Sequence, residues 1–194
     1  MTTQAASVTS TQNRNPAREQ APAYTLDASH SHVGFSVRHM MISNVRGEFT
    51  KLAGEVNYDP SRPEATRLDV TIDVDSINTR EEKRDAHLKS ADFFDAANFP
   101  HIKFSSKSAS RTGDGLEVVG DLTIHGTTRE VKLAVEDVTP EFADPYGFRR
   151  VGASARTKVR RSDFGMKWNA ALEAGGVLVG DEISIQIEVE LIRK

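Results

Sequence analysis

Alternation of hydrophobic and polar residues is the dominant pattern along the chain from position 24 onward. Its clearest example is a set of aliphatic residues near the C-terminus, each separated from the next by one polar residue: Ile183, Ile185, Ile187, Val189 and Leu191. A period of two places these side chains on one face, as in an antiparallel strand with water on its other face. The same alternation predicts strands over 33–37 and 68–74.

Weaker alternation predicts further strands over 45–58, 102–104, 116–124, 131–135 and 147–160. Within 45–58 the apolar residues move from odd to even positions after Phe49, so we expect a bulge or bend near Thr50 or Lys51. The sequence HGTT, from His125 to Thr128, predicts a hairpin turn between two of these strands. The chain therefore contains about eight predicted strands, bounded by turn residues.

One short segment, 79–90, is expected to be helical. Asn78 or Thr79 can cap its start, and Glu81 and Glu82 fall in the first turn, where the helix dipole favours negative charge. Pro100 stops any longer continuation. One helix of this size cannot cover the apolar faces of so many strands, so these faces have to pack against one another.

The apolar strand faces can be buried in a sandwich or in a closed barrel. Long strands with small residues at positions expected to point inward suggest an interior that its own side chains do not fill: Gly47, Gly54, Gly120, Gly152, Ala153 and Ala155. A barrel of about eight strands has room inside for side chains or for one small ligand. We therefore predict an all-β protein, an extended eight-stranded antiparallel barrel, with the sandwich as the alternative.

Length and charge limit the classes of partner. The 194 residues suffice for one domain, expected over 23–194, behind a disordered N-terminal tail over 1–22. A formal net charge of −3 argues against nucleic acid as the main partner. The basic run RTKVRR, from Arg156 to Arg161, is interpreted as a solvated strand face.

The chain contains no cysteine, which excludes disulfides and thiolate chemistry. No apolar run is long enough for a secretory signal or a transmembrane segment, so we expect a cytoplasmic protein.

Few residues form a pattern suited to catalysis. His30 and His32 have the spacing of a metal-binding pair, but the strand parity separates them from His39, so no metal site is predicted. Asp85 and His87, beside Arg84 on the predicted helix, are an alternative acid–base pair. No nucleophile elbow and no phosphate-binding glycine loop is present.

Four runs, in order and in register over about 24–192, resemble the YceI-like family of polyisoprenoid-binding proteins. They are YTLDASHSHVGFSVRHMMISNVRGEFTKLAGEVNYDP, DVDSINTREEKRDAHLKSADFFDAANFPHIKFSS, GDLTIHGTTREVKL and RSDFGMKW. The resemblance implies a lipocalin-like barrel with an apolar tunnel that holds a long isoprenoid, an isoprenoid quinone or a similar lipid. It also implies that the segment FFDAANFP closes or supports the barrel near an opening.

From the residues alone, a packed barrel and a ligand tunnel remain open; the resemblance favours the tunnel. The expected function is then to bind and carry the lipid without chemistry, with no cofactor and no metal, in a monomer or a homodimer. The alternative is a hydrolase or isomerase of a lipid-like substrate that uses Asp85 and His87. The expected apolar contacts of the ligand are Phe35, Val37, Phe49, Leu68, Val70, Ile72, Phe104, Leu122, Ile124, Leu133, Trp168, Ile185 and Ile187. The expected contacts of a polar head group are His39, Arg84 and His87.

Overall fold

A closed antiparallel barrel of eight strands forms the body of the protein in a computed structural model, which describes residues 21–113, 115–172 and 175–194. Neighbouring strands pair around the ring, and β12 closes it by pairing with both β11 and β1. The ring consists of β1 (Ala23–Leu26), β4 (Leu52–Asn57), β5 (Arg67–Asp73), β7 (His101–Thr112), β8 (Gly115–Ile124), β9 (Thr127–Glu136), β11 (Arg149–Arg160) and β12 (Val179–Arg193). The predicted fold class is confirmed.

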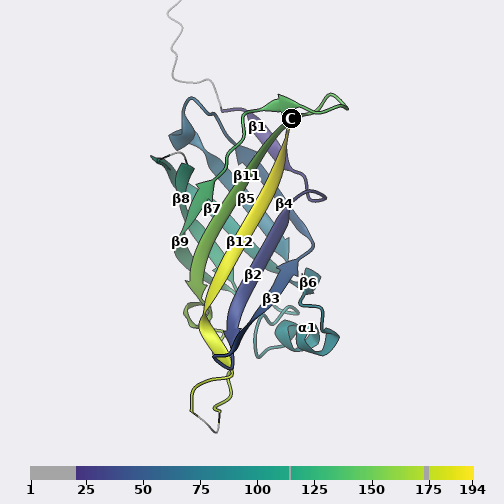
Figure 1. Cartoon of the computed structure of the whole chain (residues 1–194), viewed down its shortest axis with the longest axis vertical. Helices are drawn as coiled ribbons and strands as arrows, with labels where there is room; N and C mark the ends of the chain where they lie inside the picture. The colour runs from purple at the N-terminus through teal and green to yellow at the C-terminus, as the bar shows by residue number, and fades with distance from the viewer. Residues whose placement is uncertain (1–20, 114, 173–174) are drawn as a thin grey trace, which may run out of the picture.

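The long strand β12 explains how further strands extend the wall. Its C-terminal end pairs with β1, and its N-terminal part pairs with β2 (His32–His39) over 179–188. The sheet then continues through β3 (Ser43–Phe49) to the short β6 (Ile77–Asn78), while β10 (Phe142–Ala143) pairs with the start of β11. The result is an elongated barrel in which β2 and β3 reach past its lower end (Figure 1).

The expected strand interruptions are present. The break between β3 and β4 falls at Thr50 and Lys51, where the apolar parity changes. The turn between β8 and β9 consists of His125 and Gly126, both with positive φ, at 50° and 69°. Glycine adopts this backbone conformation without strain, which suits it to the second position of the turn.

The helix α1 (Glu82–Lys89) begins later than a cap at Asn78 or Thr79 would allow. Its N-cap is Glu81, whose side chain accepts a hydrogen bond from the backbone N–H of Lys83. The residue before it, Arg80, has a φ of 64°, so the chain turns through a left-handed conformation before the helix starts. Thr79 instead donates its backbone N–H and its hydroxyl to Asp85.

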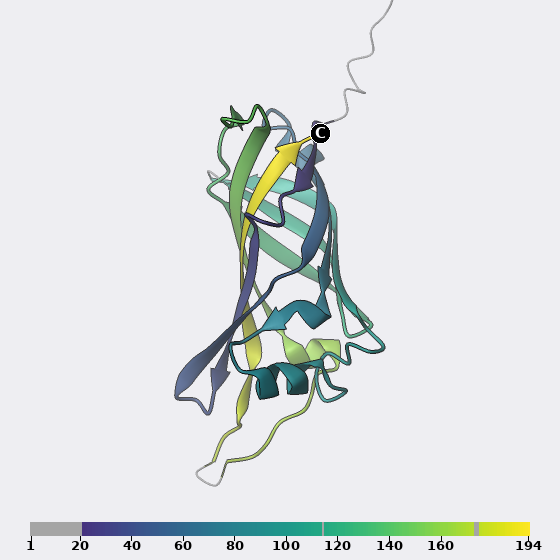
Figure 2. The same ribbon diagram turned by 90° about the vertical axis from the view of Figure 1, so that its right-hand side faces the viewer.

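Short 3-10 helices complete the described part of the chain: η2 (Pro63–Ala65), η3 (Val74–Ser76) and η4 (Arg161–Phe164). Both α1 and η4 lie at the lower end of the barrel (Figure 2). No helix among the described residues is long and apolar enough to cross a membrane.

Two glycines that were expected to leave space inside the barrel are covered by aromatic rings. A Cβ atom at Gly47 would lie 2.5 Å from Cζ of Phe35, and one at Gly120 would lie 2.5 Å from Cζ of Phe104. The expectation was therefore wrong at these positions, because each ring occupies the space above its glycine. The cavity is instead lined by Ala153 and Ala155 of β11.

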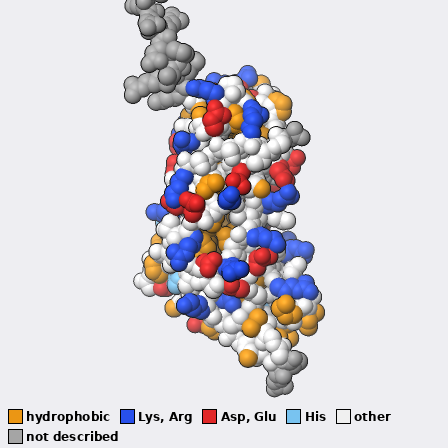
Figure 3. Space-filling view, turned by 90° about the vertical axis from the view of Figure 1, so that its left-hand side faces the viewer, with side chains coloured by type: hydrophobic (Ala, Val, Ile, Leu, Met, Phe, Trp, Pro, Cys, Tyr) orange, Lys and Arg blue, Asp and Glu red, His pale blue; other side chains and the backbone are white. Residues whose placement is uncertain are grey.

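The barrel wall is incomplete at one seam. β9 and β11 pair only from Ser154 opposite Glu136 to Arg156 opposite Ala134, although both strands continue beyond this point. Figure 3 views this side of the molecule and shows hydrophobic side chains in a hollow between charged ones.

Candidate functional site: an apolar tunnel inside the barrel

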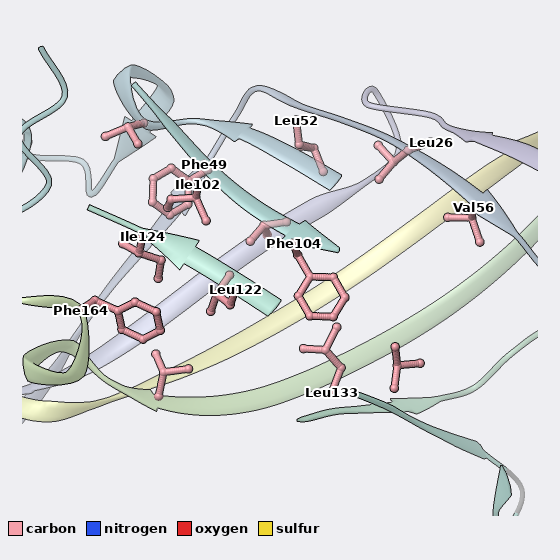
Figure 4. Close-up of a cluster of buried hydrophobic side chains, with 14 of the residues drawn as sticks. Leu26, Phe49, Leu52, Val56, Ile102, Phe104, Leu122, Ile124, Leu133 and Phe164 are labelled. Carbon is pink, nitrogen blue, oxygen red and sulfur yellow. The ribbon is translucent and has the colours of Figure 1, made fainter. Parts of the chain in front are cut away.

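A cavity of about 260 Å³ lies inside the barrel, and strands from all around the ring line it. It extends from Leu26, Val56 and Leu191 at one end to Phe94 and Arg161 at the other. Figure 4 shows side chains from several of these strands pointing into the same interior. Since nearly all of the lining is aliphatic or aromatic, the space suits a hydrocarbon chain and disfavours water.

Twelve of the predicted contact residues line this cavity. They share the inward parity of their strands, which is the signal that identified them. They are Phe35, Val37, Phe49, Leu68, Val70, Ile72, Phe104, Leu122, Ile124, Leu133, Ile185 and Ile187. Their contact with a ligand stays a prediction.

The other four predicted residues, His39, Arg84, His87 and Trp168, are not among the residues that line the cavity. Sequence reasoning also left out several lining residues that the same parity rule would have found, among them Leu116, Val118, Val131, Val151 and Val159.

The segment after α1 covers the lower end of the cavity. Leu88, Phe93 and Phe94 all contribute to its lining, and the ring of Phe94 packs edge-on against Phe49 with centroids 5.8 Å apart. The backbone N–H of Phe94 donates to the carbonyl of Leu88 at 3.0 Å, which folds the two phenylalanines back onto the helix. The connector therefore closes the barrel with apolar side chains, as expected from FFDAANFP.

Asp85 and His87 do not form an acid–base pair. Asp85 accepts both the backbone N–H and the hydroxyl of Thr79, while Nε2 of His87 lies 2.9 Å from a carboxylate oxygen of Asp92. Arg84 donates to the hydroxyl and to the carbonyl of Thr79. The contacts of Arg84 and Asp85 with Thr79 hold the start of the helix to the preceding loop, whereas His87 contacts the segment that follows the helix.

Trp168 packs outside the cavity, against the covering segment. Its ring centroid lies 4.8 Å from that of His87 and 5.3 Å from that of Phe93. Since Phe93 itself lines the cavity, Trp168 supports the cover from behind. A contact between Trp168 and a ligand stays a prediction.

Arg161 is buried, which corrects the interpretation of RTKVRR as a solvated face. Its guanidinium donates to the carbonyls of Met166, Trp168, Val179 and Gly180, at 2.8 to 3.3 Å. Burial lowers the pKa of this guanidinium. The sequence contained the signal, because Arg161 shares the odd parity of the inward-facing residues of β11, whereas Arg156, Lys158 and Arg160 are exposed.

His30 and His32 have different carboxylate partners and do not converge. Nδ1 of His30 lies 2.9 Å from Asp27, and Nδ1 of His32 lies 3.1 Å from Glu48. Asp27, His30 and Glu190 lie close enough together to hold a cation. However, the guanidinium of Arg150 already binds Asp27 and Glu190, at 2.7 and 2.5 Å.

Arg150 gives the group around Asp27 a structural explanation. It also binds Asp144, at 2.6 Å, so one cation joins the ends of three segments. Hydrogen bonds from Ser29, Arg150 and His30 hold the pKa of Asp27 well below its usual range. The positive charge of Arg150 offsets the carboxylates, so we interpret the cluster as an ion network that ties down the upper end of the barrel.

The fold and the cavity together define an eight-stranded lipocalin-like barrel with an apolar interior. The model of the YceI-like domain family matches residues 24–191, and the chain belongs to this family. Protein YceI of Escherichia coli (strain UMN026) is 36% identical over 149 residues, which cover 76% of this chain and 78% of that protein.

Two solved structures have the same fold. The crystal structure of Burkholderia cenocepacia BcnA matches with a TM-score of 0.75 at 24% identity, over 85% of this chain and 98% of that one. A polyisoprenoid binding domain from Saccharophagus degradans, implicated in plant cell wall breakdown, matches with a TM-score of 0.65 at 15% identity, over 89% and 99%.

Proposed function

We propose that this protein binds a long-chain isoprenoid, or a similar amphiphilic lipid, in the tunnel of its barrel and carries it without chemical change. The observation that carries the proposal is the cavity of about 260 Å³ inside the barrel, with an almost entirely apolar lining. A protein of the same fold is a polyisoprenoid binding domain, which supports the choice of ligand class.

Binding follows from the transfer of the hydrocarbon chain out of water. Drug-sized ligands gain about 0.3 kcal/mol per heavy atom, so an isoprene unit of five carbons adds roughly 1.5 kcal/mol. That corresponds to about a tenfold gain in affinity per unit. The length of the tunnel is then the main determinant of ligand length, because each unit that fits inside adds the same increment.

The positions of the polar groups support binding rather than acid–base catalysis. Asp85 and His87 are each engaged by a separate neighbour, and neither lines the cavity. Arg84, His87 and His39 stay candidates for contact with a head group at the lower end. Alanine variants of Arg84 and His87 test this: unchanged lipid affinity in both would remove them from the site.

The direct test is mass spectrometry of an organic extract of the purified protein, with a variant whose tunnel is blocked as the control. The proposal predicts a stoichiometric long-chain lipid from the wild type and none from the blocked variant. An empty extract calls for reloading with isoprenyl alcohols of increasing length. Failure of all of them to bind would reject the proposal.

A further inference from the structure

The unpaired seam between β9 and β11 opens into a cleft that touches the tunnel. The cleft is lined from β9 by 129–132, from β11 by 157–160, and by Asp163, Phe164 and Glu182. Three of these residues, Val131, Thr157 and Val159, also line the interior cavity. The two spaces are therefore separated by only a few side chains, because no backbone ladder joins β9 to β11 at this level.

The register of the paired part predicts which residues a longer ladder would bring together. Glu136 faces Ser154 and Ala134 faces Arg156, so the same register would place Lys132 opposite Lys158. Like charges directly opposite each other destabilise an antiparallel pair. Each lysine instead forms an ion pair with the strand on its other side: Lys132 with Glu117 on β8, and Lys158 with Glu182 on β12.

Two further cations at the rim have no such partner. Among the residues that the structure describes, neither Arg129 nor Arg160 forms an ion pair with a carboxylate, and both side chains are exposed. Glu130 is paired with Lys107 and Glu182 with Lys158, which leaves Asp163 as the acidic side chain of the cleft without an ion pair to any described residue. Within the described part of the chain, the rim thus offers two exposed guanidinium groups without an ion pair, one of them (Arg129) donating to the carbonyl of Thr128, against one carboxylate without an ion pair.

We propose that this cleft is a lateral portal in which the anionic head group of the bound amphiphile is held by Arg129 and Arg160, while its hydrocarbon chain lies in the tunnel. The inference rests on the proposed function and adds the class of head group and its position. A guanidinium binds phosphate or carboxylate oxygens through paired hydrogen bonds, and the cleft places such groups beside an apolar interior.

A side portal also explains how a charged head can stay in water. Among the described residues that line the tunnel, one is charged, Arg161, and four backbone carbonyls already accept its hydrogen bonds. Burying an unpaired anion in such a lining is strongly unfavourable. Between β9 and β11 the head can remain at the surface, because no strand pairing has to break around Val131 and Val159.

The test compares a long-chain isoprenyl phosphate with the uncharged alcohol of equal length, by displacement of a fluorescent lipid. Two exposed charge contacts are together worth about a tenfold change in affinity. We expect Arg129→Gln/Arg160→Gln to lower the preference for the phosphate about tenfold and to leave alcohol affinity unchanged. Asp163→Asn should raise that preference.

Two double variants are the controls. Arg46→Gln/Arg80→Gln removes the same charge from exposed positions outside the cleft and should have no effect. Arg84→Gln/His87→Gln tests the rival head-group position at the covered end. If Arg84→Gln/His87→Gln lowered the preference for the phosphate and Arg129→Gln/Arg160→Gln did not, the portal would be rejected.

The remaining outcomes separate this inference from the proposed function. Binding of both lipids with an unchanged preference in Arg129→Gln/Arg160→Gln would reject the portal and retain the tunnel. Binding of neither lipid by the wild type would reject both. Inorganic phosphate is measured alone as well: if it binds the wild type as tightly as the lipid phosphate, the cleft is a site for free phosphate and the portal is rejected.

Discussion

A large side chain placed halfway along the tunnel should shorten the lipid that the protein accepts. Ile185 suits this test, because it lines the cavity midway between Val179 and Leu191, the outermost lining residues of β12. Its cross-strand neighbours, Phe35 on β2 and Thr157 on β11, also line the cavity, so a larger side chain at this position extends into the barrel interior. The change is Ile185→Trp.

The expected size of the effect follows from the strand geometry. The lining from Val179 to Leu191 spans roughly 40 Å of strand at ~3.3 Å per residue. With the strand tilt typical of barrels, about 40°, this is roughly 30 Å along the barrel axis. A block at Ile185 leaves about half of that length on either side. Wild-type affinity should rise about tenfold per isoprene unit until the tunnel is full. In Ile185→Trp the rise should stop at about half that chain length.

The assay is displacement of a fluorescent lipid by isoprenyl alcohols of increasing length. Gln186→Trp is the matched control, since the adjacent side chain is exposed and does not line the cavity. Inserting extra atoms into a filled core lowers the free energy of unfolding by about 1–3 kcal/mol, and by less where empty space is present. Urea unfolding therefore confirms that the variant is folded. If affinity stopped rising at the same chain length in the wild type and in folded Ile185→Trp, an interior tunnel would be refuted as the binding site.

Three further predictions concern stability, measured by urea unfolding. Gly120→Ala should destabilise the fold by about 1–3 kcal/mol, because the new methyl group would lie 2.5 Å from the ring of Phe104; Gly152→Ala, with its nearest atom at 3.5 Å, should cost much less. Arg161→Met should cost about 3 kcal/mol, since it leaves buried carbonyls without a donor; a cost near zero would contradict its assignment as a structural tie. Arg150→Gln should also destabilise the fold at neutral pH, because it leaves its carboxylate partners without their shared cation. Two of its carboxylate partners, Asp27 and Asp144, have lowered pKa values, so their stabilising effect is present above the unfolded-state pKa near 4 and is lost as the pH falls further. The cost of Arg150→Gln should shrink over that acidic range, and a cost independent of pH would count against the ion network.

Period two was sufficient to predict the strand faces and most of the tunnel lining. In β12 and β11 every apolar residue of the inward parity lines the cavity, because successive side chains on a strand must point to opposite sides of the sheet. The parity change after Phe49 likewise located the break between β3 and β4. These features depend on the local geometry of the chain, which the sequence determines directly.

Only the tertiary structure determined the contacts between residues that are distant in the sequence. The glycines at 47 and 120 are covered because a ring from a neighbouring strand reaches over them, and no local pattern reports such a contact. Asp85 and His87 lie two positions apart in the sequence, but Asp85 accepts a hydrogen bond from Thr79 and His87 contacts Asp92. The seam between β9 and β11 depends on which charges a strand register brings face to face, and this is fixed only when distant strands pair.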